Sequence, residues 1–219
     1  MFKKLLALTI FTSTLTLPLY QANASTNVNP TFDNNDVLNS NELEAIRNSE
    51  EEYTIPLTYE QAVERTAEMT NKTITEVKGE NPEKSNVRML ASTAAASGNV
   101  CGWQETSTNV TVKSSTQKLI VILKSCRNGS FGWIEKKKKP MLQEFKASGG
   151  KSFAGTIKVD LNDNGFYYVA NGNFYNGTTV THSGTTGVTT VFTATYNVAA
   201  TSNHYASIYT GLKWRKVTN

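Results

Sequence analysis

Four consecutive lysines, Lys136–Lys139, form the densest group of charged side chains in the sequence, and Lys146 and Lys151 follow soon after. Such a run produces a positive potential that attracts polyanions. Lysines also have a purely structural use at the edge of a sheet, where they prevent pairing with another chain. We favour the binding interpretation and predict an anion-binding patch made of Lys136, Lys137, Lys138, Lys139, Lys146 and Lys151.

Residues 160–165 read D-L-N-D-N-G, which matches the beginning of a calcium-binding loop. The twelfth position of such a loop should offer a carboxylate, but Asn171 stands there. Asn-Gly between two strands is the preferred hairpin turn, because both positions need a positive φ. We therefore predict a turn at Asn164-Gly165 and no metal site, with a weak calcium site as the alternative.

Catalytic groups form no recognisable motif. His182 and His204 are the only histidines, and no G-x-S-x-G sequence accompanies the serines. A pair of carboxylates could hydrolyse a glycosidic bond, but those of the C-terminal region suit turns and ion pairs better: Glu105, Glu135, Glu144, Asp160 and Asp163. The sequence predicts a protein that is not an enzyme and needs no cofactor.

The two cysteines, Cys101 and Cys126, both lie in the C-terminal half. In an oxidising compartment the simplest outcome is a disulfide, which closes a loop of about 25 residues and stabilises the fold by about 3 kcal/mol. The alternative is two buried thiols, since Gram-positive exporters form few disulfides. A structural metal site would need four ligands, and neither histidine has suitable spacing to the cysteines. We predict the Cys101–Cys126 disulfide.

Aromatic residues cluster in the same region, as in Phe166-Tyr167-Tyr168. Adjacent side chains of a strand point to opposite faces, so Tyr167 must lie opposite its two neighbours. Some aromatic surface is therefore exposed. Exposed Tyr and Trp on a sheet suit stacking against sugar rings or a place in a membrane interface.

The beginning of the chain carries an export signal. Lys3 and Lys4 precede the apolar stretch Leu5–Leu19, and Ala22-Asn23-Ala24 is a small-x-small cleavage site. The stretch is too short and interrupted for a retained anchor, which needs about 20 apolar residues. We predict a signal peptide over residues 1–24, a mature chain from Ser25, and a product that is secreted, either extracellular or associated with the cell wall.

Charge divides the mature chain into two halves. Ser25–Ala96 contains 13 acidic and 6 basic residues, a net charge of −7, whereas the chain from Ser97 onward contains 5 acidic and 14 basic residues, a net charge of +9. This asymmetry suggests either two modules or an acidic leader that neutralises a basic domain until it is removed.

The acidic half of the mature chain contains few apolar side chains that could form a core. Residues 25–56 contain few large apolar side chains and are predicted to be disordered, apart from a short helix near Asn41–Asn48. Residues 57–80 are predicted to form a short helical pair, because Thr58 with Gln61 and Thr73 with Glu76 make two capping boxes. Residues 81–98 read as a linker, with Arg88 as a possible protease recognition site.

Residues 99–219 read as strands, because β-branched and aromatic residues alternate with polar ones. Leu119–Leu123 is a continuous apolar run that suits a central strand covered on both faces. In the longest candidate strand, residues 188–198, the side chains of Phe192, Ala194, Tyr196 and Val198 point to the same face. The other candidates are residues 109–113, 130–135, 152–160, 165–170, 172–176 and 204–214. The pattern predicts a mainly β protein, an antiparallel sandwich or barrel of about eight strands.

Export, net charge and the lysines together favour a non-catalytic binding module that associates with an anionic cell-wall polymer or a membrane surface. Nucleic acid is not expected, because no basic-aromatic reader motif is present. The alternative is an antibacterial or membrane-active protein made with a removable acidic leader, whose Thr- and Val-rich strands act at a target membrane. The sequence does not indicate an oligomeric state.

Overall fold

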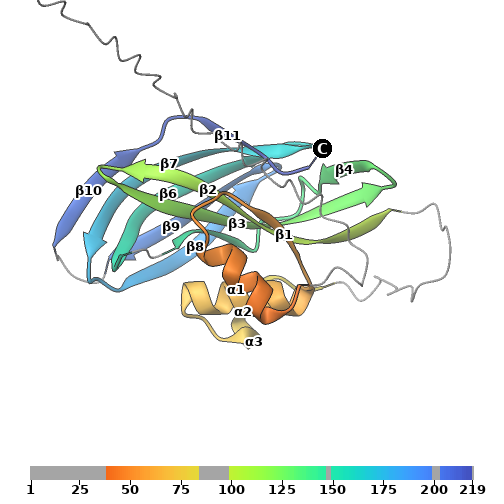
Figure 1. Ribbon diagram of the computed structural model, residues 1–219, viewed down its shortest axis with the longest axis horizontal. Helices are drawn as coiled ribbons and strands as arrows, with labels where there is room; N and C mark the ends of the chain where they lie inside the picture. The colour runs from red at the N-terminus through yellow and green to blue at the C-terminus, as the bar shows by residue number, and fades with distance from the viewer. Residues whose placement is uncertain (1–37, 84–98, 147–148, 199–202, 219) are drawn as a thin grey trace, which may run out of the picture.

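The computed structural model describes residues 38–83, 99–146, 149–198 and 203–218, which form three helices and eleven strands. Two antiparallel sheets pack face to face, and the helices cover the outer side of one of them (Figure 1). The predicted mainly β sandwich is confirmed. The predicted signal peptide, and Arg88 with most of the predicted linker, lie outside the described residues.

The first sheet has the order β1-β2-β3-β4, and β5 also pairs with β3. Its strands are β1 (Thr54–Leu57), β2 (Val100–Val112), β3 (Ser115–Asn128), β4 (Phe131–Ile134) and β5 (Leu142–Lys146). Leu119–Leu123 is fully buried, as predicted. Leu119, Val121 and Leu123 point into the space between the sheets, whereas Ile120 and Ile122 point toward the helices.

The second sheet has the order β10-β7-β6-β9-β8, and β11 also pairs with β7. Its strands are β6 (Lys151–Leu161), β7 (Gly165–Asn176), β8 (Val180–Val188), β9 (Val191–Val198), β10 (His204–Tyr209) and β11 (Lys213–Lys216). Phe192, Ala194 and Tyr196 are buried between the sheets while Thr193 and Thr195 are not, so the predicted alternation is confirmed. The described part of residues 99–219 contains ten strands where about eight were predicted.

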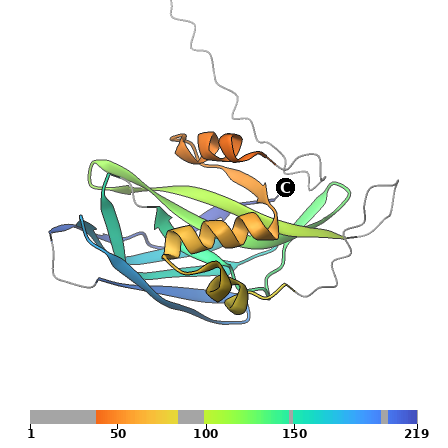
Figure 2. The same ribbon diagram turned by 90° about the horizontal axis from the view of Figure 1, so that it is seen from below.

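A helical layer is made of α1 (Ser40–Asn48), α2 (Tyr59–Thr70) and α3 (Ile74–Glu80). Both predicted capping boxes are present, and a third joins Asn39 to Glu42 at the beginning of α1. Figure 2 shows α2 lying across the outer face of the first sheet. The layer has no core of its own, because its apolar side chains pack against Trp103, Ile120 and Ile122.

The prediction of disorder over residues 25–56 is wrong for its C-terminal part. There α1 forms and β1 pairs with β2, with Ile55 opposite Glu105. Leu43, Tyr53 and Ile55 are too few to bury one another, but the outer face of the first sheet buries all three. The predicted short helix near Asn41–Asn48 is confirmed.

Candidate anion-binding site

The lysine run Lys136–Lys139 lies in the connection between β4 and β5. Lys136 Nζ forms an ion pair of 2.7 Å with Asp163, and Lys138 Nζ lies 5.8 Å from the centre of the Trp103 ring. Lys137 is exposed, whereas Lys139 is half-buried. Lys136 and Lys138 thus have different neighbours, and Asp163 already compensates the charge of Lys136.

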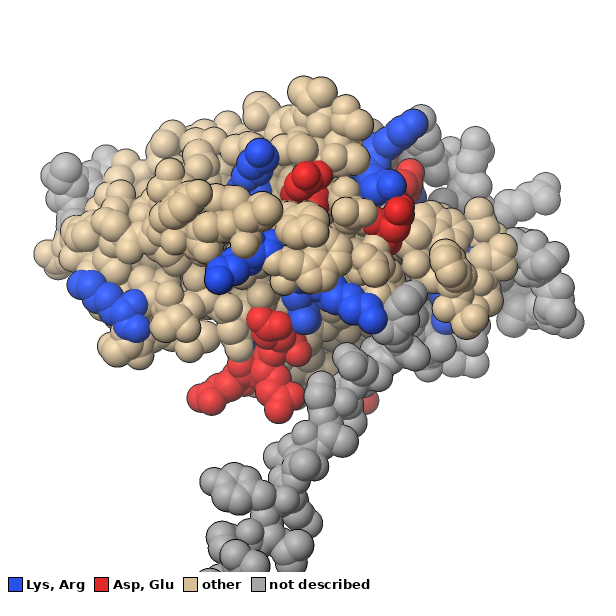
Figure 3. Space-filling model, turned by 90° about the horizontal axis from the view of Figure 1, so that it is seen from above, with Lys and Arg blue, Asp and Glu red and all other residues tan. Residues whose placement is uncertain are grey.

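The six predicted lysines do not form one patch. Lys151 is the first residue of β6, and Asp163, which binds Lys136, follows the last residue of that strand. The 11 residues of β6 separate these points by about 35 Å. On the face drawn in Figure 3, basic side chains likewise lie in separate small groups, with acidic side chains between some of them.

A different group of lysines gathers where the β2–β3 hairpin turns. We call Lys113, Lys118, Lys146 and Lys151 the lysine quartet. Lys113 lies in the turn itself with a positive φ of 53°, and Lys118 lies near the beginning of β3. Lys146 ends β5 directly opposite Lys118, and Lys151 begins β6. The quartet therefore keeps two of the predicted residues and adds two that the sequence analysis missed.

Tyr205 joins two members of the quartet. The ammonium groups of Lys113 and Lys151 lie 5.0 Å and 4.7 Å from the centre of its ring. Lys113 also donates a hydrogen bond to the Tyr205 carbonyl oxygen. Hydrogen bonding to Ser115, then to Ser114, and then the charges of the two lysines lower the pKa of the Tyr205 phenol. Two cations share one aromatic ring at this end of the sandwich.

The other two members line an open hollow of about 610 Å³ between the end of α1 and the first sheet. Lys118 donates to the carbonyl oxygens of Ser49 and Glu51, and Lys146 donates to Asn48 Oδ1 at 2.9 Å. Burial, followed by the charge of Lys146, lowers the pKa of Lys118. The remaining lining residues are Arg47, Asn48, Ser49, Glu50, Thr116 and Gly149.

The lysines of the quartet have acidic residues nearby but none in direct contact: Glu50 lines the hollow, and the charges of Glu50 and Glu52 act on Lys118 from a distance. Within the described ranges, no carboxylate oxygen lies within 4 Å of any ammonium group of the quartet. Lysines placed directly opposite each other on neighbouring strands repel, as Lys118 and Lys146 do here. An anion bound between Lys118 and Lys146 would relieve this repulsion.

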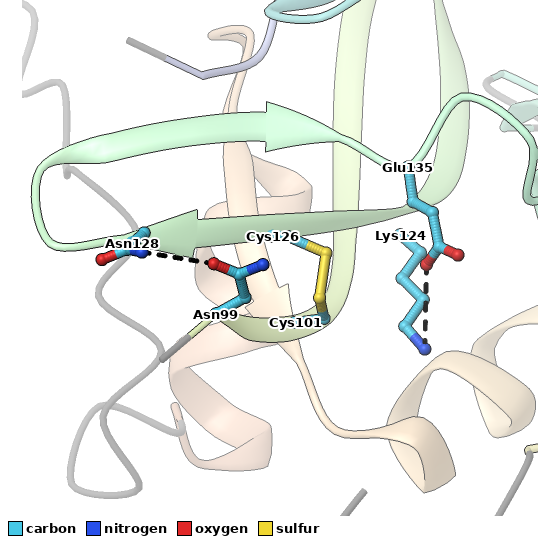
Figure 4. Close-up of a disulfide and its surroundings, with 6 residues drawn as sticks. All are labelled: Asn99, Cys101, Lys124, Cys126, Asn128 and Glu135. Atoms are coloured by element: carbon cyan, nitrogen blue, oxygen red, sulfur yellow. Dashed lines mark hydrogen bonds and ion pairs between the residues drawn. A yellow bond between two sulfur atoms is a disulfide. The ribbon is translucent and has the colours of Figure 1, made fainter. Parts of the chain in front are cut away.

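The predicted disulfide is confirmed and holds the hairpin that carries the quartet. Cys101 and Cys126 are register partners on β2 and β3 (Figure 4). The hairpin turn with Lys113 lies at the opposite end of these strands. Beside the disulfide, Asn128 Nδ2 donates to Asn99 Oδ1 at 3.3 Å. The bond fixes the pairing of β2 with β3, and this pairing places Lys113 and Lys118.

The residues considered for hydrolysis are dispersed. Asp160 accepts a hydrogen bond from Thr190, Asp163 binds Lys136, and Glu135 lies 4.0 Å from Lys124. Among the described residues, no carboxylate lies within 4 Å of either histidine. These residues form no acid-base pair.

The hairpin turn after β6 is confirmed, but its central residues are Asp163 and Asn164. The Asn162 N–H donates to the Gly165 carbonyl at 2.8 Å, and neither Asn164 nor Gly165 has a positive φ. Gly165 is required for a different reason. A Cβ atom there would lie 2.2 Å from the Arg215 carbonyl oxygen of β11. The described residues contain no cluster of potential metal ligands.

Glu105 is the centre of a buried ionic cluster beneath the helical layer. Arg47 of α1 donates to both of its oxygens, with Nη2 at 2.7 Å from Oε2. Tyr53 donates its hydroxyl proton to Oε1 at 2.7 Å, and Arg65 Nε of α2 lies 3.7 Å from the same oxygen. Burial, and then the Glu105 charge, raise the pKa of Tyr53. The cluster ties both helices to β2.

Glu144 is partly buried on the same side of the sheet, and its buried Oε2 has no hydrogen-bond partner among the described residues; this burial raises the pKa of Glu144 to about 8. Its unfolded pKa lies near 4.5. The neutral carboxyl therefore stabilises the fold fully below pH 4.5, and this contribution is lost as the pH rises through 8. Over that window we expect the free energy of unfolding to fall by up to about 1.4 kcal/mol per pH unit.

Glu144→Gln should remove this pH dependence, because the amide stays neutral. Urea unfolding at pH values from 4.5 to 9 measures it, with Glu135→Gln as the control at an exposed glutamate. We expect the Glu144→Gln protein to be the more stable at pH 9 and to match the parent near pH 4.5. If the free energy of unfolding depended on pH in the same way in both proteins, burial would not disfavour the charged form of Glu144.

The fold and site together define a β-sandwich with a helical layer on one face and a basic end. No known protein family matches the chain, and comparisons with curated proteins and with solved structures found no significant similarity. Among the described residues, no helix has the length and apolar character needed to cross a bilayer.

Proposed function

We propose that this protein is a secreted, non-catalytic binding module that associates with an anionic cell-surface polymer through the lysine quartet. Export is supported by the signal sequence, and the disulfide suits an oxidising compartment outside the cytoplasm. The observation that carries the proposal is four gathered ammonium groups with no carboxylate in contact.

A polymer fits this site better than a single small anion. The quartet extends from the hairpin turn at Lys113, around Tyr205 and Lys151, to the hollow beside Lys118 and Lys146. Charges spread over several strands bind a chain of phosphates or carboxylates more strongly than one ion, because each contact releases counterions. The fixed β-sheet scaffold holds the lysines in place before binding.

The variant Lys113→Gln/Lys151→Gln tests the proposal. Both side chains lie on the outside of the fold, so stability should change little. We expect at least a tenfold loss of affinity for wall teichoic acid at low ionic strength, and a weaker dependence of binding on salt. Binding is measured by calorimetry or sedimentation between about 50 and 500 mM NaCl, a range over which screening becomes strong.

The matched control is Lys158→Gln/Lys213→Gln, which removes the same net charge from the second sheet. It should retain most of the affinity. Equal losses of affinity in both double variants would mean that the net charge of the protein, not the lysine quartet, determines binding. Binding that does not change with salt would remove the electrostatic basis of the proposal. Dye-loaded anionic liposomes add a further test, because a binding module should adhere to them without leakage.

The second candidate, a membrane-active protein with a removable acidic leader, requires release of the helical layer. That layer contributes β1 to the first sheet and Arg47 and Arg65 to the Glu105 cluster. Its release would expose a buried carboxylate and the apolar side chains Ile120 and Ile122. These contacts favour a permanent layer, so we rank the binding module first.

A further inference from the structure

The outer face of the second sheet carries aromatic and amide side chains at alternating positions. The outward positions of β7 hold Tyr167, Val169, Asn171, Asn173 and Tyr175, and they alternate with Phe166, Tyr168, Ala170 and Phe174, which are buried between the sheets. Apart from His204, no acidic or basic residue occupies an outward position on β7 or β10, which are described in full. This composition differs from that of the lysine quartet and suggests a different ligand.

Aromatic rings occur at three levels along β7. Trp214 of β11 lies opposite Tyr167, with ring centres 4.7 Å apart and exposures of 41% and 37%. Tyr209 of β10, which is 72% exposed, lies opposite Asn171. Tyr175 contacts the His204 ring at 5.8 Å. Positions 167, 171 and 175 are four residues apart, so the levels repeat about every 13 Å.

Hydrogen-bonding side chains fill the space between these rings. Ser207 donates to Asn173 Oδ1 at 2.7 Å, and His204 Nε2 lies 3.2 Å from the same oxygen. This arrangement orients the Asn173 amide and leaves its nitrogen available to an external acceptor. On the neighbouring strand, Thr156 lies beside Asn171. Two charged residues of β6 lie opposite outward positions of β7: Lys158 opposite Val169, and Asp160, which accepts a hydrogen bond from Thr190, opposite Tyr167.

We propose that this face binds a neutral polysaccharide. Sugar rings present C–H faces that stack on aromatic side chains and hydroxyl groups that pair with amides and hydroxyls. A polyanion would find little positive charge on these strands. Insertion into a membrane would strip water from Asn171, Asn173 and Thr156 without replacing their hydrogen bonds. An evenly spaced series of rings fits a linear chain of sugars.

Affinity electrophoresis of the full mature chain tests the proposal. Separate gels contain hydroxyethylcellulose, mixed-linkage β-glucan, galactomannan or glycogen. We expect at least one of them to retard the protein, equally with and without added salt. Tyr209→Ala and Trp214→Ala should each weaken the retardation about tenfold. Phe131→Ala is the matched control, because Phe131 is 75% exposed but lies in β4 of the first sheet.

Several outcomes would overturn the proposal: no retardation in any of the four gels, retardation abolished by salt, or equal weakening in Phe131→Ala. Binding of the parent protein, but not of Tyr209→Ala, to neutral phosphatidylcholine vesicles would assign the face to membranes instead. The Lys113→Gln/Lys151→Gln variant should behave as the parent in these gels, so the polysaccharide face and the lysine quartet are tested separately. Thermal unfolding monitored by circular dichroism confirms that each variant is folded.

Discussion

Arg47→Met is expected to lower the free energy of unfolding by about 3–5 kcal/mol, the usual cost of leaving a buried charge without its partner. Arg47 donates to both oxygens of Glu105, whose carboxylate is completely buried. Methionine fills much of the same volume but cannot donate a hydrogen bond. Tyr53 and the more distant Arg65 would remain as the only partners among the described residues.

Urea unfolding at pH 7 measures this loss, and a second substitution at the same position separates charge from packing. Arg47→Lys keeps a positive charge beside Glu105 but lacks the planar group that donates to both carboxylate oxygens, so it should lose less stability than Arg47→Met. Equal losses in the two variants would mean that lost packing, not an uncompensated carboxylate, destabilises Arg47→Met.

Two further variants complete this experiment. Glu44→Gln removes the other carboxylate near Arg47, which is 3.5 Å away and 56% exposed, and should change stability by less than about 0.5 kcal/mol. Arg47→Met/Glu105→Gln removes the buried charge together with its partner and should recover most of the loss. Failure of this double variant to recover would show that the pair does not act as a unit.

Local patterns in the sequence were enough to predict much of the fold. The alternation in Phe192–Val198 and the continuous apolar run Leu119–Leu123 gave the correct strands and the correct buried faces. The capping boxes at Thr58 and Thr73 gave the beginnings of α2 and α3. In each case the signal depends on neighbours within four residues, which a sequence shows directly.

Strands with weak local signals were missed. β8 (Val180–Val188) contains glycine, serine and threonine and buries no side chain completely, so it shows no apolar alternation. β5 (Leu142–Lys146) is short and pairs with β3 only because the chain turns back after β4. Likewise, β1 was read as part of a disordered segment because its apolar partners lie beyond residue 99.

The lysine quartet depends on strand register, which the sequence does not display. Lys118 and Lys146 meet because β5 pairs with β3, and Lys113 meets Lys151 because both contact Tyr205 of β10. A consecutive run such as Lys136–Lys139 stands out in a sequence, yet in the fold one of its members is neutralised by Asp163. Separation along the chain was therefore a poor guide to which cations lie together.

A chain that starts at Asn99 is expected not to fold, although it retains every residue of the core between the two sheets. Ile120, Ile122 and Leu142, all buried beneath the helical layer, would become exposed. Burial of such side chains is worth about 1.5–3 kcal/mol each, so their exposure alone costs about 5–9 kcal/mol. Domains of this size are stable by about 5–15 kcal/mol, and the unpaired Glu105 adds a further penalty.

The measurement compares near-ultraviolet circular dichroism and urea unfolding of residues 38–219 and 99–219. The longer chain should unfold cooperatively, and the shorter one should lack fixed aromatic signals. A peptide of residues 38–83 added in trans should restore them, because β1 and the arginines of α1 and α2 recreate the same contacts. A chain cut at an engineered site between Glu83 and Asn99 should likewise keep its two parts together.

A stably folded 99–219 chain would contradict this expectation and would change the ranking of functions. It would show that the acidic residues can leave without loss of the sandwich, as the removable-leader hypothesis requires. If the shorter chain fails to fold, a cut before Asn99 cannot release an active basic domain unless another surface replaces the helical layer. Residues 38–83 would then belong to the working protein, because they cover the outer face of the first sheet and pair with β2.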